Sequence, residues 1–252
     1  MKILVSPAKK LDLSDENYSL ESTDSIFLKQ SETIMNSLSS LSVLEISKLM
    51  KLSSNLSILN YDRNKKWKLP ISKNEGKQAL LSFKGDVYKS MKIGEFNNSD
   101  FKFANQNLRI LSGLYGILRP SDLILPYRLE MGTKLQIGKD KNLYSFWKEI
   151  LTNHLLEELK EEPCLVNLAS DEYFKVIDKN KIPIPVITPI FKDTKNGKVK
   201  VISFFAKKAR GEMCNFIITN KIKSVEQLKL FNNNNYQFSI KESTDLNLVF
   251  IR

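Results

Sequence analysis

The stretch ILSGLYGILRP, residues 110–120, holds two glycines three positions apart in an apolar run. We predict a helix that begins after an N-cap at Ser99 and ends at Gly113, which would adopt the left-handed conformation. Gly116 has no role in that helix, and two alternatives stay open for it. It either lets two backbones pack closely, or belongs to a helix-hairpin-helix motif whose backbone N–H groups hold phosphate. That motif match is weak, because the glycine spacing is unusual and Pro120 would interrupt a second helix.

Apolar periodicity on both sides of this stretch predicts a mixture of helices and strands. Helical spacing occurs in residues 24–51, 77–91, 144–160 and 206–219, and short apolar runs typical of buried strands occur at 1–6, 164–170 and twice near the C-terminus. The runs IPVITPIF and KVKVISFF flank Asn196-Gly197, which predicts a hairpin turn. Because the order of elements is irregular, we expect an α+β fold: one domain, residues 1–252, with a mixed sheet flanked by helices.

The formal net charge is +11, which suits a polyanionic partner, although the frequent lysines and asparagines also fit the codon bias of an AT-rich genome. The charge is unevenly distributed. Residues 191–230 carry ten basic and three acidic side chains, residues 61–92 carry nine and three, and residues 149–178 carry two and eight. We therefore expect a polarised surface rather than a uniformly basic one.

The ligand inventory excludes several classes of site. His154 is the single histidine, and Cys164 and Cys214 are far apart, so zinc, haem and iron–sulfur centres are disfavoured. We expect both cysteines to be reduced and buried, no bound cofactor and no metal site. The N-terminus lacks the apolar core of a signal peptide and no apolar run is long enough to span a bilayer, which favours a cytoplasmic protein without a membrane partner.

Basic side chains gather at the start of a predicted helix in AKKARGEMCNFII. Lys207, Lys208 and Arg210 oppose the helix dipole there, which costs some stability. A local rule broken in this way favours a functional role. A solvated basic face is an equally acceptable interpretation.

Polar residues also follow the predicted strand at 164–170. Ser170 is expected to cap a short helix, with Asp171 and Glu172 in its first turn. Capping accounts for these three residues without chemistry, but it does not account for Asn167 and Tyr173. The end of a strand that leads into a helix is a frequent place for active-site groups.

Two further segments combine a cation, a carboxylate and a phenol. FKGDVY contains Lys84, Asp86 and Tyr88, and PYRLEMG contains Tyr127, Arg128 and Glu130. If the segments meet, acidic residues could supply acid–base groups or hold magnesium while basic residues neutralise phosphate. The candidate catalytic residues are Asp86, Glu130, Asp171, Glu172 and Tyr173. No standard catalytic fingerprint is present, so the sequence leaves open whether the protein is an enzyme.

Six blocks together carry a family resemblance: SPAKKLD, FKGDVY, LSGLYGILRP, PYRLEMG, NLASDEYFK and ISFFAKKARG. In this order they resemble the YaaA peroxide-stress family. The resemblance implies a cytoplasmic bacterial protein that lowers available iron during hydrogen peroxide stress and limits oxidative damage to DNA and protein. It also implies binding of double-stranded DNA through a basic cleft with a helix-hairpin-helix-like element. The block SPAKK, where SPAKT is expected, and the Asn232–Asn235 run depart from the family pattern.

The resemblance assigns the helix-hairpin-helix-like element to Leu108–Leu123, which includes Gly113 and Gly116. The basic cleft would be lined by Lys9, Lys84, Arg119, Arg128, Lys207, Lys208 and Arg210. Our first hypothesis is a DNA-binding protective protein, and the alternative is an enzyme that acts on a nucleic acid or nucleotide. Direct iron sequestration is the weakest hypothesis, because only carboxylate and phenolate ligands would be available for it.

Overall fold

The computed structural model describes residues 1–12, 14, 21–195 and 197–252. Its central feature is a mixed sheet that, within these residues, has eight strands in the order β11-β12-β9-β8-β1-β5-β6, with β10 paired to β9. The parallel strands are β5 (Leu108–Ser112), β1 (Lys2–Val5), β8 (Leu165–Asn167), β9 (Val186–Lys195) and β12 (Asn247–Ile251). The antiparallel strands are β6 (Gly116–Leu118), β10 (Lys198–Lys200) and β11 (Gln237–Phe238). Every residue of β5 and β8 is buried, as expected for parallel strands covered on both faces.

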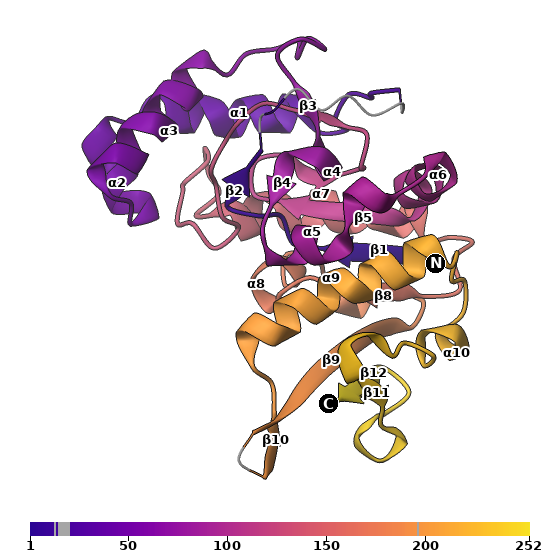
Figure 1. The fold of residues 1–252 in the computed structure, drawn as a ribbon. Helices are drawn as coiled ribbons and strands as arrows, with labels where there is room; N and C mark the ends of the chain where they lie inside the picture. The colour runs from indigo at the N-terminus through magenta and orange to yellow at the C-terminus, as the bar shows by residue number, and fades with distance from the viewer. Residues whose placement is uncertain (13, 15–20, 196) are drawn as a thin grey trace.

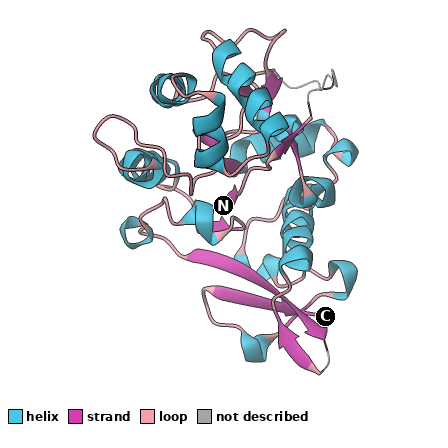
Figure 2. Ribbon diagram, turned by 90° about the vertical axis from the view of Figure 1, so that its left-hand side faces the viewer, coloured by secondary structure: helices cyan, strands magenta, loops and turns pink. Residues whose placement is uncertain are grey.

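Helices cover this sheet and extend beyond one end of it. The longer ones are α1 (Leu28–Ser39), α2 (Val43–Met50), α3 (Ser54–Lys66), α6 (Asn98–Asn107), α7 (Leu143–Glu158) and α9 (Ser203–Thr219). The short ones are α4 (Ala79–Ser82), α5 (Asp86–Met91), α8 (Asp171–Phe174), α10 (Val225–Leu228) and 3₁₀ turns at Ile93–Glu95, Lys179–Lys181, Asn233–Asn235 and Ile240–Glu242. Figure 1 shows α1, α2 and α3 grouped at one end, whereas α9 crosses in front of the sheet. In Figure 2 the long strand β9 lies at the opposite end from that helical group.

Two small two-stranded sheets connect segments of the N-terminal half. In one, β2 (Lys10–Leu11) pairs with β4 (Phe83–Lys84), which sets Lys10 opposite Lys84. In the other, β3 (Lys77–Gln78) pairs with β7 (Leu123–Ile124). The predicted α+β arrangement with a mixed sheet and flanking helices is therefore confirmed. None of the helices in the described ranges is both long and apolar enough to cross a membrane.

The predicted helix from Ser99 to Gly113 is wrong in its second half. α6 begins after Asn97, which forms a capping box with Asp100, and it ends at Asn107. Residues 108–112 are instead the fully buried strand β5, which is parallel to β1 and antiparallel to β6. Sheet pairing thus overrides helical spacing, and the helix-hairpin-helix element in Leu108–Leu123 is not confirmed because this segment forms a β-hairpin.

The two glycines of this hairpin make close contacts of different kinds. Gly116 has a φ of +71°, and a Cβ there would lie 2.8 Å from a methyl carbon of Leu151 and 2.9 Å from the ring of Trp147. The predicted close packing at Gly116 is therefore present, but its neighbours are two side chains rather than a second backbone. Gly113 does not adopt a positive φ, so its predicted left-handed role is wrong; a Cβ there would collide with the carbonyl oxygen of Leu129.

Other predicted elements are confirmed in part. The strand 186–195 and the strand 198–200 form the expected hairpin, in which Gly197 has a φ of +70° and Asn196 lies outside the described residues. The predicted helix 77–91 is divided into α4 and α5 by the short strand β4. Cys164 and Cys214 are both free and buried, as predicted.

Candidate functional site

Two serines mark the edge of the sheet at which the candidate site forms. Ser6 follows β1 and Ser170 follows β8, and these neighbouring strands are parallel, so both serines emerge at the same edge. The backbone N–H of Ser170 donates to Ser6 Oγ at 2.9 Å, and the two hydroxyl oxygens are 3.2 Å apart. The phenol of Tyr88 donates to the Ser6 carbonyl at 3.0 Å. Ser170 occupies the N-cap position of α8 as predicted, but its hydroxyl makes no cap hydrogen bond and contacts Ser6 instead.

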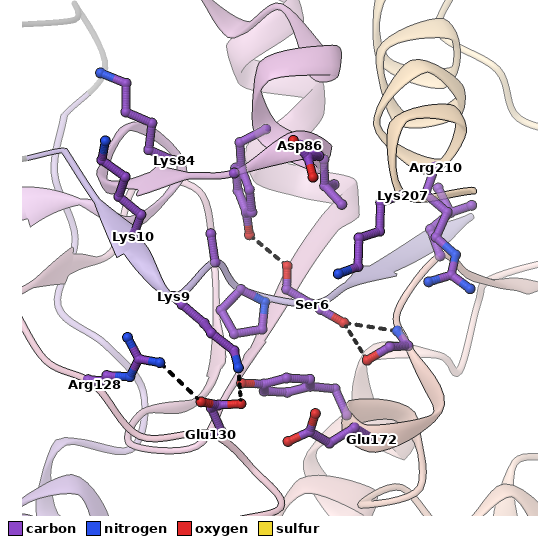
Figure 3. Close-up of a pocket in the computed structure, with 18 of the residues that line it drawn as sticks. Ser6, Lys9, Lys10, Lys84, Asp86, Arg128, Glu130, Glu172, Lys207 and Arg210 are labelled. Carbon is purple, nitrogen blue, oxygen red and sulfur yellow. Dashed lines mark hydrogen bonds and ion pairs between the residues drawn. The ribbon is translucent and has the colours of Figure 1, made fainter. Parts of the chain in front are cut away.

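A pocket of about 370 Å³ opens beside these serines, a volume typical of sites for small ligands. Figure 3 shows Lys10 and Lys84 on one flank, Lys207 and Arg210 on another, and Glu130 and Glu172 on a third side. Of the residues predicted as site residues, the pocket is lined by Lys9, Lys84, Asp86, Arg128, Glu130, Glu172, Tyr173, Lys207 and Arg210. Segments far apart in the sequence therefore meet at one place.

The remaining predicted site residues lie outside this lining. Asp171 is in the first turn of α8, close enough for its charge to act on Arg210. Lys208 lines a neighbouring cavity of about 750 Å³, which shares Asp86 with the pocket. Gly113 and Gly116 lie in the hairpin. Arg119 also lies outside the pocket, where its Nε donates to Asp122 at 2.9 Å and its terminal nitrogen donates to the Asp24 carbonyl at 2.8 Å.

Sequence reasoning missed two polar residues of the pocket, Ser6 and Lys10. Both belong to the block SPAKKLD, which contributed only Lys9 to the predicted site. A polar residue directly after a buried parallel strand is a signal that could have identified Ser6. Lys10 could not be recognised in this way, because its place depends on the pairing of β2 with β4.

Charge in the pocket is mixed but predominantly positive: six lysines and arginines line it together with three carboxylates. Glu130 lies between two of the cations, with its oxygens 2.6 Å from Lys9 Nζ and 3.5 Å from an Arg128 nitrogen. Lys84 pairs with Asp12 and holds the pKa of that carboxyl well below its usual range. The Nε of Arg128 is buried and has no hydrogen-bond partner within the described part of the chain.

Lys207 and Arg210 differ from Lys9, Lys84 and Arg128 because neither has an ion pair or hydrogen bond to another described residue. They are three residues apart on α9, so both can face the pocket. Burial lowers the pKa of Arg210, and the nearby charge of Asp171 opposes that shift. These two side chains are therefore available to bind an anion.

The phenols of the pocket remain neutral over the physiological range. Burial raises the pKa of Tyr88, Tyr127 and Tyr173 above the usual value for tyrosine. Tyr127 also shares a 2.6 Å hydrogen bond with the Ser112 hydroxyl at the end of β5. These groups can donate hydrogen bonds but are poor bases at neutral pH.

Two of the three carboxylates in the pocket already have partners. Glu130 pairs with Lys9, and Glu172 accepts a hydrogen bond from the backbone N–H of Gly132 at 3.0 Å. Asp86, at the start of α5, has no ion pair or hydrogen bond with the other described residues. Within the described ranges, no group of three His, Cys, Asp or Glu side chains is arranged to hold a metal ion. Asp86 is thus the carboxylate most available for acid–base chemistry.

Comparison with known proteins identifies the family. The family model described as peroxide stress protein YaaA matches residues 1–242. The chain belongs to the YaaA peroxide-stress family. A UPF0246 protein of Flavobacterium psychrophilum is 48% identical over 252 residues and covers 100% of both chains. A UPF0246 protein of Colwellia psychrerythraea is 48% identical over 254 residues, covering 100% of this chain and 99% of its own. One from Aliivibrio fischeri is 46% identical, with coverage of 100% and 98%.

The blocks that carried the YaaA resemblance have a common location. Five of them contribute residues to the pocket, namely the blocks that begin at Ser6, Phe83, Pro126, Asn167 and Ile202. The sixth, LSGLYGILRP, supports the pocket from outside, because Ser112 bonds Tyr127 and Gly113 contacts the backbone of Leu129. The blocks on which the resemblance was based thus largely build this site.

Proposed function

We propose that this peroxide-stress protein binds duplex DNA through the cations around its pocket and, with a role in lowering available iron, limits oxidative damage to DNA. The observation that carries the proposal is the unpaired state of Lys207 and Arg210 beside the flank formed by Lys10 and Lys84. Phosphate contacts of this kind supply most of the affinity in binding without sequence preference. A duplex is too wide to enter a 370 Å³ pocket, so it would lie across the mouth.

A salt series of duplex binding, followed by fluorescence anisotropy, tests this proposal. For phosphate contacts, log K falls with log salt by about 0.9 for each phosphate neutralised. We expect the Lys207→Ala, Arg210→Ala double variant to flatten that slope by about two units. The matched control is the Lys66→Ala, Lys139→Ala pair, which removes the same charge from exposed positions outside the pocket. Equal slopes for the two double variants would contradict a specific role for α9.

The second candidate function is catalysis on a nucleotide or nucleic acid. It is supported by carboxylates inside a site that otherwise favours anions, because a site that only held phosphate would be weakened by them. Asp86 is the candidate base, while Glu130 orients Lys9 and Arg128.

The variant Glu130→Gln separates the two functions. Loss of its charge frees Lys9 and Arg128, so DNA affinity is expected to stay the same or rise. Under catalysis, survival of cells exposed to hydrogen peroxide falls despite that affinity. Under binding alone, survival follows affinity. Glu157→Gln, on the exposed face of α7, is the control for loss of one negative charge.

A further inference from the structure

We propose that Phe204, in the first turn of α9, is a stacking site for an unpaired nucleic-acid base. The inference rests on the proposed function and extends it from paired duplex to DNA that exposes an unpaired base beside the same cations. The residue is 50% exposed, although a large apolar side chain is expected to be buried. Its position at the start of a 17-residue helix fixes its backbone, so its exposure belongs to an ordered element.

The surroundings of Phe204 hold its ring in place. The ring of Phe205 lies 5.6 Å away, centroid to centroid, at an interplanar angle of 60°. Lys208 Nζ lies 4.4 Å from the centroid of Phe204, within the range of a cation–π contact. Phe205 is in turn packed against the Arg252 guanidinium at 4.6 Å. The exposed Phe204 ring is therefore in contact with a second ring, which Arg252 supports, and with Lys208.

The charge around Phe204 selects the kind of partner. No Asp or Glu occurs between Asp193 and Glu212, whereas the segment carries exposed basic residues at Lys195, Lys198, Lys200, Lys207 and Lys208. Val199 and Val201, on and just after β10, are also exposed. A surface that combines an aromatic ring with lysines complements a ligand with alternating flat apolar groups and negative charges. Bases and phosphates of a single strand have this chemistry.

The start of α9 also separates two cavities. Lys207 and Arg210 face the 370 Å³ pocket, whereas Phe205 and Lys208 line the 750 Å³ cavity on the other side. Asp86 lines both. A strand that crosses this turn would meet Lys207 on the side of the pocket and, on the side of the larger cavity, Lys208, which contacts the Phe204 ring. The base must be unpaired, because stacking on a side chain needs a base face that is free of its neighbour.

The test uses two labelled probes of equal length, a single-stranded DNA oligonucleotide and an abasic oligonucleotide with the same number of phosphates. We expect Phe204→Ala to weaken binding of the first probe about tenfold and to leave the second unchanged. Phe204→Trp is expected to restore affinity, and its fluorescence should be quenched by the base-bearing probe alone. Ile240→Ala, which removes an exposed apolar side chain outside both cavities, is the matched control.

The other possible outcomes show which of the two proposals, stacking or DNA binding, has failed. If Phe204→Ala weakens binding of both probes equally, or of neither, stacking is overturned. DNA binding is still supported in that case if the salt slope depends on Lys207 and Arg210. If the unaltered protein binds no nucleic acid, both proposals fail. If Phe204→Ala instead reduces binding only to phosphatidylserine vesicles, the surface belongs to a membrane and stacking is overturned.

Discussion

At the scale of single residues, Arg119 acts in the fold rather than in the pocket. The Asp122 side chain is 0% exposed and accepts hydrogen bonds from the Arg119 guanidinium at 2.9 Å and the Thr23 hydroxyl at 2.6 Å. Burial raises the pKa of Asp122, and these partners oppose the shift. The sequence favoured Arg119 as a phosphate contact, but in the structure the Arg119 guanidinium pairs with the buried Asp122 carboxylate and stabilises the fold.

Arg119→Ala is therefore expected to lower the free energy of unfolding by about 3 kcal/mol, because it leaves a buried carboxylate without its cation. DNA affinity of the folded fraction should be unchanged. Urea denaturation and anisotropy measure the two quantities separately. Arg119→Lys keeps the charge but not the planar guanidinium, so its free energy of unfolding should lie between those of the unaltered protein and Arg119→Ala. A stable Arg119→Ala protein with reduced affinity would return Arg119 to the DNA interface.

His154 predicts how stability depends on pH. Burial lowers its pKa below the usual 6.5, because the ring lies against Phe27 and its Nε2 is buried. Glu158 is 3.7 Å away and raises the pKa, but its carboxylate already pairs with Arg109, which opposes protonation of His154 together with Arg119. We therefore take burial as dominant.

The unfolded state then binds the proton more readily than the folded state, so stability falls as pH falls through 6.5 and is regained above it. The slope is expected to stay below about 1.4 kcal/mol per pH unit, the limit for one proton. Urea denaturation at about pH 7.5 and about pH 5.5 measures it. His154→Gln should abolish most of this difference, since the chain has one histidine. An undiminished difference would place the titrating group elsewhere.

At the scale of elements, the hairpin β5–β6 connects the core to the pocket. Gly113 lies against the backbone of Leu129, next to Arg128 and Glu130, and Ser112 bonds Tyr127. The 126–132 segment is thus positioned by a strand that contributes no side chain to the pocket. An apolar family block that does not touch ligand can still determine the geometry of the site.

Gly113→Ala tests this connection. The added methyl group must displace the Leu129 carbonyl, which we expect to cost about 2 kcal/mol of stability. DNA affinity should also fall, because Arg128 and Glu130 move with that backbone. Gly138→Ala provides the control: its φ of +55° makes a side chain unfavourable, but no neighbour lies within 4 Å of the new Cβ. A destabilised Gly113→Ala protein with unchanged affinity would show that the pocket tolerates this shift.

The elements that sequence reasoning missed have two different physical causes. α3 buries Ser57, Asn60 and Asn64 and leaves Ile58 and Leu59 exposed, so its polarity is the reverse of an amphipathic surface helix. Residues 108–112 have apolar spacing compatible with a helix, but they pair with β1. Periodicity predicts an element only when its buried face is apolar and its neighbours are local. Where a strand pairs with a segment far away in the sequence, a short stretch of sequence does not contain the residues that decide its structure.

At the scale of the whole molecule, the site exists because sequence blocks far apart in the chain meet at one pocket. Sequence reasoning named most of the charged residues of the pocket, because blocks rich in cations, carboxylates and phenols are recognisable by composition. It could not establish that these blocks meet, since Lys9, Lys84 and Lys207 are brought together by the parallel sheet and by packing of α5 against α9. Nor could it distinguish unpaired cations from those neutralised by a partner.

The arrangement of possible metal ligands among the described residues predicts the outcome of an iron titration. Among the described residues, no cluster of three suitable side chains exists, and Glu130 and Glu172 are already engaged. We expect anaerobic calorimetry with ferrous iron to show no saturable site at micromolar metal. An aspartate- or glutamate-dependent site of defined stoichiometry would support direct sequestration instead. A titration without such a site would overturn direct sequestration.

The position of β1 also has a consequence for biosynthesis. Ile3 pairs with Leu108 on one side and with Val166 on the other, so the first strand made waits for two partners that emerge much later. The sheet continues through β9 to β12, at Asn247–Ile251. Contacts so distant in sequence slow folding and prolong exposure of apolar strands. Most of this chain must therefore leave the ribosome before its central sheet can close.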